Sequence, residues 1–404
     1  MLTVLLIIMI VALLGTIALT VTSTDVGISG NYRASRQAFY AAEAGAHSVI
    51  AAYFTMPLHL SSKLPAAAMG FATSRPDSAN YTQDKAFWIP SLVYDSATPP
   101  AWVKIESHGT VIGTNSDASV ILYVAAVYSP FSMGVFGNNR VALTGQGYFD
   151  SFDSRVAPWS EATRVPDGNI GTNSTSSGAV SVGTSSVIYG NVVIGPGGDP
   201  ATVVSANPSS ITGTITAASN LKDLTPIVDP GVGTNITITG SSSGQNISTG
   251  IYRAPEIKLG GSNRLNIIGD VTLYVTGDVS LTSQAYISIP QGSSLKLIIS
   301  GSMTINSSGT TNESLKAQNL LIYGTQSSTS ISLGGSASLY AAIYAPNADL
   351  SYSGSAGMFG SLVGKSVTVS GRGALHYDKA LDVITSTGGA LTNFRVLSWK
   401  DGHF

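Results

Sequence analysis

The sequence predicts an α+β protein in which one long, hydrophobic N-terminal helix precedes a mostly-β head. The chain begins with an uncharged apolar stretch that continues into a helix-forming segment, and its later part repeats short apolar strands separated by Gly, Ser, Thr and Asn. Only 10% of the 404 residues are charged, and 44 are glycine. This composition is typical of many short strands joined by turns, and it excludes a charged disordered chain.

The first element is a helix over residues 1–54, and we expect its first half to cross a membrane. No charged residue precedes Asp25, and residues 1–22 as a helix span about 33 Å, enough for a hydrocarbon core of roughly 30 Å. The alternative is a cleaved secretory signal, but the apolar run is longer than a signal requires and no basic segment precedes it. The expected membrane segment includes Leu5, Ile10, Gly15 and Leu19.

The second half of this helix carries small residues at intervals of four. One stripe is formed by Ala34, Ala38, Ala42 and Ala46, and the next by Ala41 and Gly45. Such stripes let helix backbones approach closely, although alanine is also simply a good helix former. We expect the helix to be softened at Gly15, Gly27 and Gly30, where glycine weakens a helix by about 1 kcal/mol each.

The segment TSTDVGISGNYRASRQAFYAAEAG, residues 22–45, resembles the N-terminal segment of PilX-type pilus assembly proteins, members of the type IV pilin class. The resemblance implies roles in assembly and helix packing for Gly30, Asn31, Arg33, Gln37, Phe39, Ala42, Glu43 and Gly45. It also implies a subunit that is held in the inner membrane, trimmed by a prepilin peptidase and drawn by the pilus assembly machinery into a helical homopolymer outside the cell.

Two features depart from the family pattern. No basic leader ending in Gly precedes Met1, so we expect that the sequence is either the mature chain or lacks an upstream part. Leu5 stands where most major pilins carry a glutamate, which favours a minor or unconventional subunit. We therefore expect Glu43 to form an intersubunit pair and the alanine stripe to face neighbouring subunits.

The middle of the chain, residues 55–134, is expected to be a connector followed by the first strands, in WVKIESHGTVIG and ASVILYVAAVYS. The second of these is a continuous apolar run, which suits a strand buried on both faces. Residues 135–404 then form the head. Its tail, NFRVLSWKDGHF, is expected to be a final strand or a cap over the open end of the head.

The head repeats a unit of strand, glycine corner and strand. Strand starts are expected near residues 271, 295, 320, 339 and 360, and corners at Gly277, Gly301 and Gly364. A period of about 20 residues predicts a right-handed parallel β-solenoid, because each coil must share its apolar core with its neighbours. A β-sandwich is the alternative. The stretches GYFDSFDSRVAPW and YAAIYAPNADLSYSG are similar to the C-terminal domain that accompanies PilX-type segments.

Few residues have the pattern of a catalytic or metal site. The compact candidates are Glu106 with His108, and the group Arg372, His376, Asp378 and Lys379. For the latter group we favour a structural role, in which Asp378 caps the helix-like KALDVI and His376 bonds locally. Asp150 and Asp153 are spaced like calcium ligands, but turn formation explains them better. We therefore expect no catalytic residue, metal or cofactor.

The function predicted from these features is that of a non-enzymatic structural subunit of a type IV pilus-like extracellular filament. It would reside in the inner membrane before assembly and in a filament at the bacterial cell surface afterwards. The net charge of −2 offers no basic face for nucleic acid. The alternatives are a membrane-anchored surface adhesin, a minor pilin that initiates or tips the filament, and a β-helical carbohydrate-active enzyme.

Overall fold

The computed structural model describes residues 2–55, 86–94, 102–126, 129–224, 227–229, 231–306, 309–384 and 394–402. The chain divides into two compact units. One, the helix–sheet unit, comprises residues 1–127 and 392–404; the other, the β domain, comprises residues 128–391. This confirms the predicted fold class of one long apolar helix followed by a mostly-β chain with a large parallel sheet.

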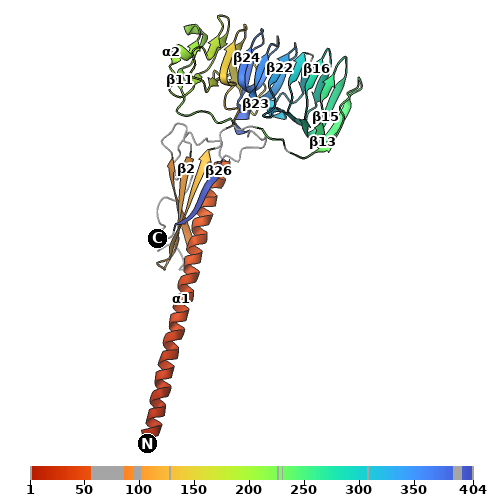
Figure 1. Cartoon of the computed structure of the whole chain (residues 1–404). Helices are drawn as coiled ribbons and strands as arrows, with labels where there is room; N and C mark the ends of the chain where they lie inside the picture. Colours follow the sequence, from red (N-terminus) through yellow and green to blue (C-terminus); the bar gives the residue numbers. More distant parts are fainter. Residues whose placement is uncertain are drawn as a thin grey trace. The chain divides into compact units, whose positions relative to one another are not determined.

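Helix α1 spans Leu2–Thr55 and is continuous through all three of its early glycines. Its length agrees with the predicted 54 residues. In the described part of the chain it is the one helix that is long and apolar enough to cross a membrane, judged by length and composition. Figure 1 shows its N-terminal half extending beyond the small sheet of the same unit.

The sheet of the helix–sheet unit has four antiparallel strands in the order β1-β2-β3-β26. These strands are β1 (Ala86–Tyr94), β2 (Trp102–Val111), β3 (Asp117–Ala126) and β26 (Phe394–Gly402). Strand β1 lies at the edge and contains Pro90, a residue that an edge strand tolerates because it lacks a backbone N–H. Apolar side chains of β2 and β3 pack against α1.

Two expectations for these segments are corrected. The tail forms β26, which pairs with β3 and completes this sheet, so it does not cap the β domain. Strands β1 to β3 belong with the helix rather than with a connector. The expected connector itself, residues 56–85, lies outside the described residues. Strand β3 is central in its sheet, and its side chains alternate between buried Val120 and Leu122 and half-buried Ile121 and Tyr123.

The β domain contains the remaining strands and short helices. Its first part comprises β4 (Val135–Leu143), β5 (Tyr148–Phe152), β6 (Ile170–Thr172), β7 (Val180–Val182), β8 (Val187–Ile188), β9 (Val192–Ile194), α2 (Pro200–Val203), β10 (Val204–Ser205), η4 (Pro208–Ser210) and β11 (Ile215–Ala217). Its second part comprises β12 (Thr234–Asn235), β13 (Gln245–Ala254), β14 (Ile257–Leu259), β15 (Arg264–Val275), β16 (Val279–Thr282), β17 (Tyr286–Ile289), β18 (Ser294–Ile299), β19 (Met303–Asn306), β20 (Gly309–Asn312), η5 (Ala317–Asn319), β21 (Leu320–Gly324), β22 (Ser330–Gly334), β23 (Leu339–Tyr352), β24 (Met358–Val369), β25 (Leu375–Asp378) and η6 (Lys379–Val383).

In the second part of this domain most paired strands run parallel and lie about 20 to 25 residues apart in the sequence. Figure 1 shows the strands side by side in a long stack. Val271 pairs with Leu295 and Leu295 with Leu320, which are the first two predicted intervals. The next two steps run from Leu321 to Ala342 and from there to Ser361. This pairing fits the predicted solenoid, whose right hand stays a prediction.

The inward Val, Ile and Leu side chains of successive strands form one continuous core. The burial pattern of β16 is representative, because Val279 and Leu281 are buried while the intervening Ser280 is half-buried. A single coil cannot bury its own inward Val, Ile and Leu side chains. Their burial depends on the coils above and below it. The core therefore stabilises the stack as a whole.

Gly277 and Gly301 form adjacent corners of this stack, as predicted. The Gly301 N–H donates to the Gly277 carbonyl, and the Gly277 N–H donates to the Pro255 carbonyl. A Cβ on Gly301 would lie 2.4 Å from Asp278 Oδ1 and 2.5 Å from the Gly277 oxygen. The third predicted corner, Gly364, lies within β24, where the strand register shifts.

We predict that Gly301→Ala lowers the free energy of unfolding of the β domain by about 1–3 kcal/mol, because backbone atoms block the added methyl group. Chemical denaturation of the full chain in detergent measures this. Gly334→Ala is the matched control, since its Cβ would meet side-chain oxygens at 3.1 and 3.4 Å. Equal destabilisation by both variants would contradict the corner argument.

The coils are not stacked in the order of the chain. The first part begins at β4 in the middle of the stack and proceeds to β11 at one end, whereas the second part begins at the other end with β12 and β13. It returns so that β24 pairs with β4 and β25 with β5. The domain is therefore closed by pairing between its first and last coils.

Described residues of the segment between β11 and β12 pack over an outer cluster of apolar residues on the β domain. Leu224 and Ile227 of this segment contact the cluster, and Ile227 bridges to Thr325. The cluster consists of Phe131, Phe136, Ile227, Tyr274, Ile298, Ala317, Leu321, Tyr323, Ala342, Tyr344, Val363, Tyr377 and Leu381. Asp229 anchors the segment through two hydrogen bonds from Arg253, which hold the Asp229 pKa at about 2.

The tyrosines of the β domain make its stability sensitive to alkali. Burial raises the pKa of Tyr352 to about 12 and raises the pKa values of Tyr323, Tyr344 and Tyr377 further. Unfolded tyrosines release their protons near pH 10. The folded chain therefore keeps these protons to a higher pH than the unfolded chain does. The free energy of unfolding keeps its full value below pH 10 and falls as the pH rises beyond it.

We therefore predict that the denaturant midpoint of the β domain falls steeply between about pH 10 and pH 12. Denaturation curves of the full chain in detergent at several pH values, followed by circular dichroism, measure the change. Substituting Tyr323 with Phe removes one titrating group and should make the fall shallower. A midpoint that is constant up to pH 12 would contradict the prediction.

Candidate functional site: the exposed half of α1 and a buried polar cluster

The first candidate site is the N-terminal half of α1. Every residue described from Leu5 to Arg33 is exposed, and the first buried side chain is Ala34. Large apolar side chains in this stretch are strongly exposed; Leu5 is 62% and Leu19 is 73% accessible. An apolar surface of this extent on a folded chain marks a protein or membrane interaction site.

The polar side chains within this apolar half bond to the helix itself. The hydroxyls of Thr16, Thr20, Thr22 and Thr24 each donate to a backbone carbonyl three or four residues earlier, at 2.7–2.8 Å. In lipid, where water cannot compete, polar groups must be satisfied internally. The predicted membrane positions Leu5, Ile10, Gly15 and Leu19 all lie on this exposed surface.

The second half of α1 packs closely on its own sheet. A Cβ on Gly109 of β2 would lie 2.0 Å from the Ala38 carbonyl oxygen and 2.5 Å from the Ala42 nitrogen. A Cβ on Gly45 would lie 2.2 Å from Ser107 Oγ. The alanine stripe thus serves the close approach of a helix to a strand within one chain.

This corrects part of the predicted assembly surface. Ala42 is fully buried and Gly45 is buried, both against the sheet, so the stripe does not face a neighbouring subunit. The other residues that the resemblance singled out lie elsewhere on the helix. Gly30, Asn31 and Arg33 are exposed, and Gln37, Phe39 and Glu43 are half-buried.

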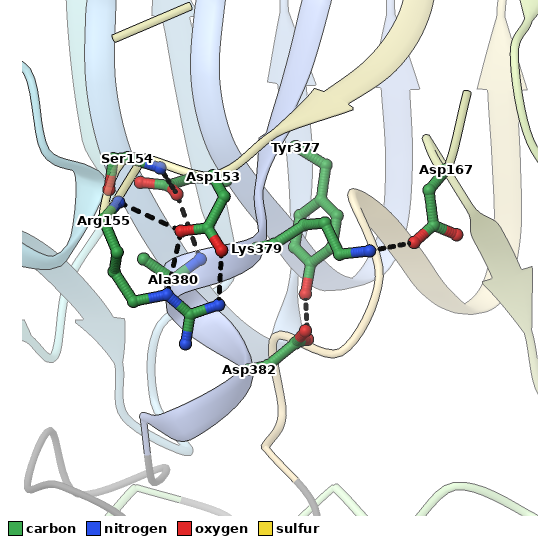
Figure 2. Close-up of polar contacts among 9 residues, drawn as sticks. Asp153, Ser154, Arg155, Asp167, Tyr377, Lys379, Ala380 and Asp382 are labelled. Carbon is green, nitrogen blue, oxygen red and sulfur yellow. Dashed lines mark hydrogen bonds and ion pairs between the residues drawn. The ribbon is translucent and has the colours of Figure 1, made fainter. Parts of the chain in front are cut away.

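A second candidate site is the polar cluster around β5 and β25 in the β domain, part of which Figure 2 shows. Lys379 pairs with Asp167 at 2.6 Å, and Arg155 pairs with Asp153 at 2.6 Å. The Tyr377 hydroxyl donates to Asp382 and also lies 2.6 Å from the Phe131 carbonyl. The Lys379–Asp167 and Tyr377–Phe131 contacts join segments that are more than 200 residues apart in the chain.

Asp378 has the predicted capping role. It is the N-cap of η6, and its Oδ1 accepts hydrogen bonds from the Ala380 N–H at 3.0 Å and the Ser154 N–H at 3.1 Å. The side chain is fully buried, and this burial raises the pKa of its carboxyl group. Asp378 therefore fixes both η6 and the loop that follows β5.

His376 does not bond locally, and that prediction is wrong. Its Nδ1 lies 2.6 Å from Oδ1 of Asp150, a residue 226 positions earlier that pairs with it across β5 and β25. His376 is 2% exposed and Asp150 is fully buried. Phe359 stacks on the imidazole and the tilted Trp159 ring packs against it, with ring centroids 4.6 and 4.0 Å away. The pair is thus sealed from solvent by aromatic rings.

Arg372 is exposed, whereas the remaining sequence candidates are in structural contacts. Glu106 of β2 pairs with Lys104 at 2.6 Å, and His108 lies 3.4 Å from the same carboxylate. Asp150 and Asp153 do not converge on one cation, because they bond to His376 and Arg155 respectively. Among the described residues, no group of three or more His, Asp or Glu side chains could hold a metal ion.

The β domain also has a polar hollow of about 450 Å³. It is lined by Asn139, Arg140, Ser176, Ser177, Gly178, Ala179, Ser181 and Ser205. Among the described residues that line it, Arg140 is the one charged residue and none is a carboxylate. The hollow therefore lacks the acid–base pair that glycosidic bond cleavage requires.

Two features were missed at the level of sequence. Trp159 covers His376, and no local pattern connects these residues. Gly109 sits at the end of an inward-facing row in β2, after Val103, Ile105 and Ser107. Glycine at an inward strand position indicates a close backbone approach. The sequence of β2 therefore indicated that another backbone packs against Gly109.

Comparison with known proteins gives one match in α1 and another in the β domain. Residues 1–46 match the family model described as PilX N-terminal, and residues 201–384 match a domain of unknown function, DUF7305. No curated protein matches the sequence. The match over residues 1–46 covers the exposed half of α1 and the start of its packing on the sheet.

Several solved structures are similar at low sequence identity. The competence-associated pilin ComZ from Thermus thermophilus has 15% identity and a TM-score of 0.37, over 91% of this chain and 97% of that one. An ice-binding protein from the Antarctic ascomycete Antarctomyces psychrotrophicus has 16% identity and a TM-score of 0.26, over 62% and 97%. A glycosylated ice-binding protein from an Arctic yeast has 12% identity and a TM-score of 0.27, over 62% and 94%.

The exposed apolar helix and the family match over it define the class of protein as a pilin related to type IV pili. More particularly, the chain carries a PilX-type N-terminal segment over residues 1–46, followed by a β-rich domain that matches DUF7305 over residues 201–384.

Proposed function

We propose that this chain is a structural subunit of a type IV pilus-like filament, which polymerises through α1 and carries the β domain on the outside. The observation that carries the proposal is the length of the exposed stretch. Residues 5–33 form about 44 Å of helix, whereas a hydrocarbon core covers only roughly 30 Å. Exposed apolar residues beyond the bilayer, such as Val26 and Ile28, need another cover.

The helices of other subunits can supply that cover. In the membrane, lipid tails contact the exposed surface at little cost, because they are as apolar as the side chains. During assembly the same surface packs against neighbouring helices, and the residues beyond the bilayer gain contacts that lipid never gave them. The alanine stripe takes no part, since it is already packed on the sheet.

The stages of this process follow from the pilin class. We propose that the chain resides in the inner membrane, is processed by a prepilin peptidase and is extracted by the pilus assembly machinery. The filament then lies outside the cell. We assign no catalysis to the chain: His376 and Asp150 are buried, and no carboxylate among the described residues lines the polar hollow.

A membrane-anchored adhesin, or a minor pilin that initiates or tips the filament, is the second candidate. The hollow around Arg140 is the observation that favours a binding role, because an exposed polar concavity can hold a ligand group. Such a protein would use α1 as an anchor only. It would be rare in filaments or absent from them, and this separates the two candidates.

The test shears surface material from cells that produce the full chain and combines negative-stain microscopy with quantification of the chain in the filaments. Ile28→Asp places a charge on α1 beyond the expected hydrocarbon core, about 40 Å from Met1. We expect this variant to be retained in the membrane fraction and lost from filaments. The matched control is Leu221→Asp on the β domain, at a residue that is 65% exposed.

The control should assemble like the wild type. If the Ile28→Asp chain assembles equally well, or if surface display persists while filaments neither contain the chain nor change, the polymer proposal is wrong.

A further inference from the structure

The face of α1 that points away from the sheet carries a row of charged and aromatic residues. Successive helix residues are about 100° apart, so Arg36, eleven residues after Asp25, lies only about 20° around the helix from it. Tyr32 lies between them on the same face. The buried Ala34, Ala38 and Ala41 lie on the opposite side, where Ala38 packs against Gly109 of β2. The Asp25 and Arg36 side chains are therefore directed away from the chain's own sheet, and both are exposed.

Asp25 is the one charged residue in the first 32 positions. In the described part of the chain, none of the ion pairs involves Asp25, Arg33 or Arg36. The Arg36 guanidinium instead lies over two rings of its own helix, 5.5 Å from the Tyr32 centroid and 6.0 Å from the Tyr40 centroid. The two rings hold the guanidinium on the outer face of the helix. Its N–H groups can donate hydrogen bonds to a further partner.

Assembly changes the surroundings of Asp25. In the membrane it lies about 36 Å along the helix from Met1, beyond a hydrocarbon core of roughly 30 Å, where water can solvate it. Packed among neighbouring helices, an unpaired carboxylate would lose that water without compensation, which is strongly unfavourable. A cation on a neighbouring helix offsets this penalty, and Arg36 is the cation that shares its face.

We propose that Asp25 of one copy of this chain pairs with Arg36 of a second, parallel copy, and that this pair sets the axial stagger between neighbouring subunits. The inference rests on the proposed function. Eleven residues correspond to about 16 Å along the axis. Arginine side chains on a helix lean towards its N-terminus by up to about one turn, so the stagger is roughly 11–16 Å.

Charge exchange tests the pairing in the full-length chain. Asp25→Arg and Arg36→Asp each place like charges opposite one another, and we expect each to lower the chain's amount in sheared filaments at least tenfold at unchanged membrane abundance. The double exchange restores opposite charges and should return assembly to within about twofold of the wild type. Asp25→Arg combined with Arg33→Asp is the matched control and should not restore it.

A second measurement uses the absence of cysteine from the sequence. The double variant Asp25→Cys with Arg36→Cys should form ladders of linked copies in intact filaments treated with a short bifunctional maleimide. Each single-cysteine variant should give no ladder.

The outcomes separate the two proposals. If wild-type chain is in filaments but the double exchange assembles no better than the worse single variant, the pairing is wrong and the filament function stands. Single exchanges that assemble like the wild type, or a double-cysteine variant without ladders, overturn the pairing in the same way. Absence of the wild-type chain from filaments overturns the proposed function and the pairing together.

Discussion

Replacing Gly109 with alanine is expected to separate α1 from its sheet and to destabilise the helix–sheet unit by about 3 kcal/mol or more. The added Cβ would lie 2.0 Å from the Ala38 carbonyl oxygen and 2.5 Å from the Ala42 nitrogen. Both obstacles are backbone atoms of a helix, so no side-chain rotation relieves the clash. Hydrogen exchange of the full chain in detergent should show faster exchange for the amides of β2 and β3.

Gly30→Ala is the matched control for this prediction. Gly30 lies on the exposed part of α1, and no atom within 4 Å would meet its Cβ. Alanine is the better helix former by about 1 kcal/mol, so this variant should leave the unit intact or stabilise it slightly. If Gly109→Ala exchanges as slowly as the wild type, the close packing of α1 on β2 is contradicted.

Replacing His376 with alanine is expected to lower the free energy of unfolding of the β domain by about 3–5 kcal/mol. The substitution leaves Asp150 fully buried, without the imidazole nitrogen 2.6 Å from its carboxylate. It also removes the ring against which Trp159 and Phe359 pack. Chemical denaturation followed by fluorescence reports on this region, because Trp159 is the single tryptophan in the β domain.

Two further variants separate the buried charge from the lost packing. Asp150→Asn with His376 retained keeps a neutral hydrogen-bonding pair and should cost much less than His376→Ala. Lys379→Ala removes a half-exposed ion pair with Asp167 and should cost at most about 1 kcal/mol. If Lys379→Ala and His376→Ala lower the free energy of unfolding equally, the burial of Asp150 does not explain the effect of removing His376.

The elements that depend on local pattern could be predicted from the sequence. The uncharged apolar run and the helix-forming segment that follows it predict α1 to within one residue of its C-terminal end at Thr55. The glycine corners and apolar triplets predict parallel strands with steps of 24 and 25 residues from Val271 through Leu295 to Leu320. These features follow from periodicity, which a linear sequence displays directly.

The contacts between distant segments could not be predicted in this way. Nothing local indicates that β4 pairs with β24, or that the tail leaves the β domain to form β26 beside β3. The same reason explains the error at His376, whose partner is 226 residues away. The alanine stripe was assigned to intersubunit packing because small residues permit close approach without specifying the partner, and here the partner is β2.

The most direct test of the account is a cryo-electron microscopy reconstruction of the filaments that contain this chain. The account predicts a core of parallel α1 helices, with residues 5–33 covered by neighbouring copies and neighbours staggered by roughly 11–16 Å. It also predicts that the β domains lie outside that core. A filament whose core is made of another protein, with this chain confined to its tip or to the membrane, would contradict it.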